Sequence, residues 1–164
     1  MPPATAPLML AYGAWLLWLL AGLGDFLCHR HTDLPRTSGL AESGLHLLQL
    51  ALIGGGVVMA LALEPSGPLA VVLGVAVAAH AVFGYLDTRS AFPRRTILPV
   101  EQHIHSVLDM APPIAFALWL VAHWPAVQGG GGFALRQPAL PLPLLAAVLA
   151  PAVLLCGLPA LMEF

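Results

Sequence analysis

The sequence contains no lysine, and its 164 residues include only six arginines and eight acidic residues. Charged side chains make up 9% of the chain, compared with roughly 25% in an average soluble domain. The arginines form no basic run interleaved with aromatic residues, so the chain lacks the pattern of a nucleic-acid-binding protein. Cys28 and Cys156 form no CxxC pair, which indicates neither a disulfide framework nor a zinc knuckle.

The sequence is predominantly apolar. Hydrophobic residues make up 59% of the chain, its mean hydropathy is +0.88, and it has 16 Gly and 16 Pro, which are both frequent in transmembrane helices. Residues 1–7 carry no basic side chain, so we expect no cleavable secretory signal and a first apolar segment that is retained. Five apolar stretches approach the roughly 20 residues that cross a bilayer as a helix: 8–28, 43–63, 68–87, 102–123 and 139–161.

These stretches predict an all-α integral membrane protein with five transmembrane helices. We expect residues 1–128 to form a four-helix transmembrane unit that binds metal, residues 129–138 to be a Gly-rich linker, and residues 139–164 to hold the fifth helix. Four prolines lie in the fifth stretch, so that helix should be kinked or begin late.

Arginine positions predict the orientation in the membrane, because basic residues are retained on the cytoplasmic side. Five of the six arginines follow the first or the third apolar stretch, and Arg136 lies on the opposite side. We therefore expect a multi-pass protein of the bacterial inner membrane, with these two loops and the C-terminus in the cytoplasm and the N-terminus outside.

A faint internal repeat relates the two loops. Adding 59 to a residue number maps Arg36-Thr37 onto Arg95-Thr96, Glu42 onto Glu101 and His46 onto His105. The repeat predicts two parallel helical hairpins, and duplicated units in membrane proteins often place a site at the interface between the halves.

Ionisable residues gather at one end of the predicted bundle. Of the fifteen Asp, Glu and His residues, twelve lie at the cytoplasmic ends of the first four stretches or in the adjoining loops. Residues four apart share one face of a helix, and Asp25 with His29, Glu42 with His46, and Glu101 with His105 show this spacing. An ionisable side chain within a membrane span costs on the order of 2.5–3.5 kcal/mol, so these groups need compensation.

A metal centre compensates buried carboxylates directly, since carboxylates and neutral imidazoles are ligands of iron, manganese and zinc. The arrangement follows the logic of four-helix bundles that hold two metal ions with inward-facing carboxylates and histidines. We predict two metal ions, iron in the leading hypothesis, bound by Asp25, His29, Glu42, His46, His80, Asp87, Glu101 and His105. The remaining candidates would orient these ligands or handle protons: His31, Asp33, His103, Asp109, Arg36 and Arg95.

The central segment Glu101-Gln102-His103-Ile104-His105-Ser106 and the surrounding stretches 25–46 and 87–113 are similar to uncharacterised small bacterial multi-pass membrane proteins. In ligand chemistry alone, the chain also resembles the membrane-bound di-iron desaturases and hydroxylases, whose histidine boxes lie at the cytosolic ends of transmembrane helices. The latter resemblance implies a histidine-rich metal pair that faces the cytosol and acts on a lipid.

The leading functional hypothesis is a di-iron oxidoreductase that acts on a lipid or another apolar small molecule, with an electron donor as partner. Three alternatives stay open: an intramembrane zinc hydrolase, a non-enzymatic heme-binding or ion-binding protein, and an ion-pair network between these residues and the loop arginines. The sequence leaves open whether the chain forms an oligomer. The four tryptophans are expected to pack or to lie at the membrane interface.

Overall fold

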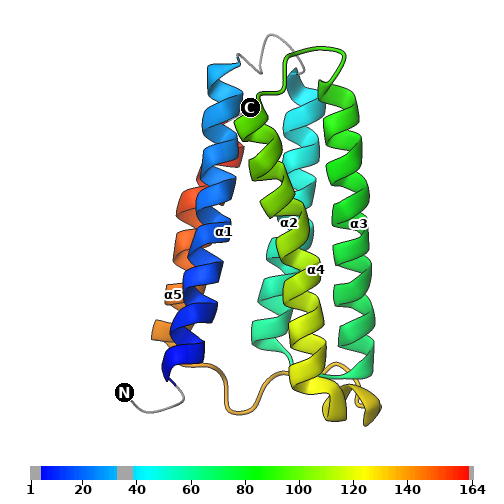
Figure 1. Cartoon of the computed structure of the whole chain (residues 1–164). Coiled ribbons are helices and arrows are strands. Elements are labelled where there is room, and N and C mark those ends of the chain that lie inside the picture. Colours follow the sequence, from blue (N-terminus) through cyan, green and yellow to red (C-terminus); the bar gives the residue numbers. More distant parts are fainter. Residues whose placement is uncertain (1–4, 33–38, 163–164) are drawn as a thin grey trace.

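The computed structural model describes residues 5–32 and 39–162. Four long helices come first: α1 (Thr5–His31), α2 (Gly39–Ala62), α3 (Gly67–Ala91) and α4 (Pro99–Gln128). They are followed by α5 (Leu142–Ala152), a π-helical turn η2 (Val153–Gly157) and α6 (Leu158–Leu161), which together form one continuous fifth rod. Figure 1 shows these rods running side by side along one axis.

The predicted fold class is confirmed, because five helical segments of the described chain are long and apolar enough to cross a membrane. Each of the first four helices extends beyond its predicted apolar stretch. The additional turns carry the polar residues at the helix ends, which hydropathy does not count as part of a span. No β-strand occurs in the two described ranges, where only an isolated bridge joins Leu63 to Leu135.

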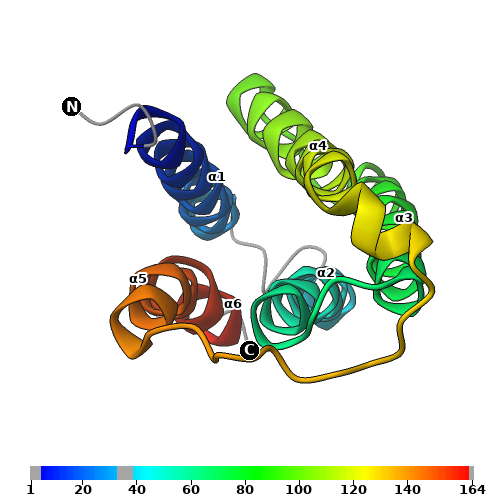
Figure 2. The same cartoon turned by 90° about the horizontal axis from the view of Figure 1, so that it is seen from below.

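The helices form a ring (Figure 2). α2 packs on α3, α3 on α4, and α4 on α1, while η2 and α6 pack on α1 and α6 also packs on α2. The fifth rod therefore closes the ring between the first and second helices. Three hydrogen bonds join it to α1. The Tyr12 hydroxyl donates to the Ala147 carbonyl at 3.1 Å, and the Trp15 indole donates to that of Val148 at 3.2 Å. The Cys156 thiol donates to the Leu19 carbonyl at 3.5 Å.

The fifth rod begins at Leu142 and contains Pro151, which has no N–H to donate to a helical hydrogen bond. The π-helical turn η2 begins two residues after this proline, at Val153. Part of the preceding linker is held against the end of α2, where the Arg136 guanidinium donates to the carbonyls of Ala60, Leu61 and Leu63 at 3.2–3.4 Å. A cation at the C-terminus of a helix is favourable there because the last carbonyls are unpaired.

Because successive helices are antiparallel, the ends of α1 and α3 and the beginnings of α2 and α4 meet at the upper end of Figure 1. This is the end to which the sequence assigned the clustered carboxylates and histidines. Orientation relative to a cytoplasm stays a prediction.

Gly84 lets α3, α2 and α4 approach one another closely. A Cβ atom at this position would lie 2.7 Å from Asp109 Oδ1 and 3.4 Å from Gln49 Oε1. We expect Gly84→Ala to lower the free energy of unfolding by about 1–3 kcal/mol, because overpacking forces these side chains to move. Thermal unfolding in detergent measures the effect, with Gly55→Ala as control because nothing lies within 4 Å of a Cβ there. Equal stability of the two variants would contradict this packing.

Candidate metal centre

The polar cluster is built from helix ends. Glu42 lies in the first turn of α2 and Glu101 in the first turn of α4, where the unpaired N–H groups of a helix favour negative charge. Glu101 also accepts a hydrogen bond from the Leu98 backbone N–H at 3.3 Å. His29 lies in the last turn of α1, where positive charge is favoured. Local helix electrostatics therefore support the side chains that the tertiary fold brings together.

The first group that could hold a metal ion consists of Asp25, His29, Glu101 and His105, which come from α1 and α4. All four side chains are buried, and each has a ligand atom within 4.8 Å of the others. His29 Nε2 lies 3.5 Å from Asp25 Oδ1 and 3.7 Å from Glu101 Oε1. Donor atoms that bind one ion at about 2.0–2.2 Å are roughly 3–3.5 Å apart, so this group is close to a coordinating geometry.

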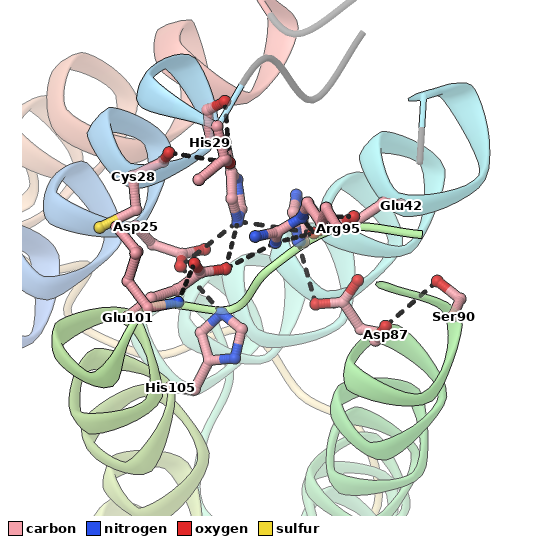
Figure 3. A network of polar contacts seen from close by, with 12 residues as sticks. Asp25, Cys28, His29, Glu42, Asp87, Ser90, Arg95, Glu101 and His105 are labelled. Atoms are coloured by element: carbon pink, nitrogen blue, oxygen red, sulfur yellow. Dashed lines mark hydrogen bonds and ion pairs between the residues drawn. The ribbon is translucent and has the colours of Figure 1, made fainter. Parts of the chain in front are cut away.

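The second group consists of His29, Glu42 and His46 and adds α2 to the site. His29 Nε2 lies 3.7 Å from Glu42 Oε1, and the imidazole rings of His29 and His46 are stacked with centroids 4.4 Å apart. His29 thus belongs to both groups, and Figure 3 shows its imidazole pointing from α1 into the cluster.

Arg95 occupies the space between the two glutamates. Its Nη2 contacts Glu42 Oε1 and lies 2.5 Å from Glu101 Oε1, while its Nε lies 3.2 Å from both oxygens of Glu42. Burial by itself lowers the pKa of Arg95, but its hydrogen bonds to Glu42 and Glu101 and their negative charge outweigh burial and raise that pKa above its usual value. The guanidinium is therefore charged at every pH at which the protein is handled.

Two aspartate–histidine pairs flank the cluster. His105 Nε2 donates to Asp25 Oδ1 at 2.9 Å between α4 and α1, and His46 Nε2 donates to Asp87 Oδ2 at 3.0 Å between α2 and α3. The first contact corresponds to the second when α1 is exchanged with α3 and α4 with α2. This correspondence agrees with the repeat in the sequence. The two aspartates are not related by the offset of 59 residues, because Glu42 follows Asp25 by 17 positions, whereas Glu101 follows Asp87 by 14.

Several predicted residues lie outside the two groups. His31 and His103 are exposed, and His103 Nδ1 bonds to the Pro99 carbonyl of its own helix at 2.8 Å. His80 is buried two helical turns before Asp87 and does not join either group. Asp33 and Arg36 lie outside the described residues.

A cavity of about 150 Å³ adjoins the cluster. The ligand candidates Asp25, His46 and His105 line one part of it, together with Asp87, and the other walls are largely apolar. His80 and Asp109 also line it, so residues outside the metal groups still face the same space.

Sequence reasoning missed Gln49 and Trp18, which line this cavity as well. A spacing of seven residues places side chains on one face of a helix two turns apart. Gln49 follows Glu42 by seven positions and Trp18 precedes Asp25 by seven. Extending each predicted ligand face by two turns would have found both residues.

The chain matches no protein-family model, and no curated protein or solved structure shows significant similarity to it.

Proposed function

We propose that the protein is a membrane di-metal oxidoreductase that uses iron and acts on an apolar substrate. The observation that carries this proposal is the buried convergence of carboxylates and histidines from α1, α2 and α4 in two overlapping ligand groups. Two ions held side by side by carboxylates and histidines from several helices are the arrangement of di-iron helical bundles.

The donor chemistry fits iron, as it fits manganese and zinc. Both groups contain only carboxylate oxygens and imidazole nitrogens, and neither contains a thiolate, which soft metals prefer. Glu42 and Glu101 both face the space between the groups, where Arg95 holds them together. Glu42 and Glu101 would hold metal through their carboxylate oxygens, and each histidine would offer one nitrogen.

The charge of the cluster also supports bound cations. Asp25, Glu42, Asp87 and Glu101 are four buried carboxyl groups, and Arg95 is the only buried arginine within residues 5–32 and 39–162. Carboxylates removed from water need positive partners close by. Metal ions would add positive charge at the place where the ligand atoms converge.

The cavity supports an apolar substrate. It leads from the cluster to walls formed by residues such as Leu50, Ile53 and Val57. An iron pair would supply redox chemistry next to this space. The chain's own part would be to exclude water and to hold the substrate with its apolar portion away from the carboxylates.

Metal content tests the proposal. We expect the detergent-purified protein, prepared without chelator, to contain about two irons per chain by mass spectrometry and to show no Soret absorption. Glu101→Gln and His105→Gln should lose most of this iron and still fold, whereas His103→Gln should retain it because His103 is exposed. About one or two zinc ions per chain would contradict the oxidoreductase and favour the hydrolase, and unchanged iron in Glu101→Gln would overturn the ligand assignment.

A further inference from the structure

Arg95 contacts the same glutamate oxygens that a metal ion would need. Its Nη2 atom contacts Oε1 of Glu42 and lies 2.5 Å from Oε1 of Glu101. His29 Nε2 lies 3.7 Å from each of these two Oε1 atoms, a distance too long for a hydrogen bond. One imidazole nitrogen and two carboxylate oxygens therefore converge from three helices, and the guanidinium already holds both oxygens (Figure 3).

The second oxygen of each glutamate is also engaged. Glu42 Oε2 lies 3.2 Å from Arg95 Nε, and Glu101 Oε2 accepts a hydrogen bond from the Leu98 backbone N–H at 3.3 Å. A metal ion bound to these carboxylates would lie beside the guanidinium, and two cations on the same pair of oxygen atoms repel each other strongly in a buried site. Arg95 and a metal ion are therefore competitors for Glu42 and Glu101.

The buried guanidinium is incompletely hydrogen-bonded. Arg95 Nη1 is buried and makes no hydrogen bond with any residue that the structure describes. All three guanidinium nitrogens are donors, and a buried donor without a partner is unfavourable. Arg95 would gain the missing hydrogen bonds from water if it left the cluster.

The segment that carries Arg95 lies at the surface. The Arg95 side chain is only 1% exposed, whereas its neighbours Arg94 and Thr96 are both exposed. Phe92, at the beginning of the same connection between α3 and α4, is exposed as well. The guanidinium is thus attached to backbone at the polar end of the bundle, and rotation of one side chain is enough to bring it into water.

We propose that Arg95 is a displaceable counter-ion, which holds Glu42 and Glu101 in the metal-free protein and leaves them when metal binds. The inference rests on the metal site of the proposed function, but it requires neither iron nor a redox reaction. Before metal arrives, the guanidinium compensates two buried carboxylates that would otherwise destabilise the fold. Part of the free energy of metal binding then breaks this ion pair, so the arginine lowers the affinity of the site for metal.

Metal affinity tests the exchange. Zn²⁺ is titrated into chelator-treated protein in detergent, in competition with a chromophoric chelator of known affinity. Because the arginine-free cluster is the minor state of the parent, Arg95→Gln should bind Zn²⁺ at least about tenfold more tightly. Arg94→Gln is the matched control, since Arg94 is the adjacent and exposed arginine, and its affinity should remain within about twofold of the parent.

A second measurement uses the parent protein, so it decides the question even if Arg95→Gln fails to fold. Phenylglyoxal modifies accessible guanidinium groups, and peptide mass spectrometry locates the modified residues. Without metal, Arg95 should react far more slowly than Arg94, and saturating Zn²⁺ should raise its rate towards that of Arg94. Arg136, which donates to carbonyls at the end of α2, is an internal control whose rate should not depend on metal.

The outcomes separate this inference from the proposed function. Tighter Zn²⁺ binding by Arg95→Gln and metal-dependent modification of Arg95 support the exchange, whichever metal the native protein carries. Equal or weaker binding by Arg95→Gln, or an Arg95 that stays protected in the metal-loaded parent, would overturn the exchange even if the protein contains two irons. Zn²⁺ binding by Arg95→Gln alone would support the exchange and contradict the proposed function, because the arginine would then exclude metal from the parent.

Discussion

His29→Gln should lose more bound metal than His46→Gln. His29 belongs to both ligand groups and lies 3.5–3.7 Å from carboxylate oxygens of Asp25, Glu42 and Glu101. His46 belongs only to the group that contains Glu42. In the parent protein we expect about two ions per chain. His29 is a candidate ligand in either group and His46 in only one, so the loss of His29 should reduce the metal content further.

Metal analysis of the purified variants gives this comparison directly, and His103→Gln is the control because its side chain is exposed and outside both groups. Glutamine is close in size to histidine and offers only a weak oxygen ligand, so the helix packing should be retained. A His29→Gln protein that still holds two ions per chain would show that the ligand groups are wrongly assigned. Equal losses in His29→Gln and His46→Gln would mean that the two ions bind as one cooperative unit.

Arg95→Gln should strongly destabilise the metal-free protein. The guanidinium is the buried cation that contacts both Glu42 and Glu101, which are themselves completely buried. Removing one partner of a buried ion pair leaves uncompensated charge and costs about 3–5 kcal/mol. Added metal should restore more stability to this variant than to the parent, since an ion supplies the charge that arginine supplied.

Thermal unfolding of chelator-treated protein in detergent, repeated after addition of Fe²⁺, measures both effects. Arg94→Gln is the matched control: it removes the neighbouring arginine, which is exposed, and should change stability by no more than about 0.5 kcal/mol. The stabilisation by Arg95 should not vary between about pH 5 and 9. Its pKa in the folded protein is raised, so the contribution is complete below the usual pKa of arginine and is lost only above it. Metal-free Arg95→Gln as stable as the parent would contradict the role of this residue as counter-ion.

The site shows why some of its members were predictable and others were not. Asp25 with His29, Glu42 with His46, and Glu101 with His105 share helix faces, and a spacing of four residues reveals such pairs without any tertiary information. Trp18 and Gln49 lie on the same faces but are two turns farther along, where a tryptophan or a lone amide in an apolar segment carries no metal-ligand signal. The structure identifies them as walls of the cavity.

Arg95 illustrates the opposite case. In the sequence it is one of several loop arginines that bias membrane orientation, and nothing local separates it from Arg94 beside it. In the structure Arg94 is exposed and Arg95 is buried between two glutamates from different helices. Which of the two arginines in the segment between α3 and α4 is buried depends on how these helices pack. The spacing of residues in the sequence does not specify that packing.

The sequence by itself determined the helical membrane architecture and the end of the bundle at which the ionisable residues meet. Hydropathy and helix length specify spans, and antiparallel neighbours place alternate loops at the same end. Only the tertiary structure decided which residues converge, because helix rotation and the order of helices around the ring control distances between helices. That order places α1 against α4 and α2 against α3, and it makes His29 the residue shared by both ligand groups.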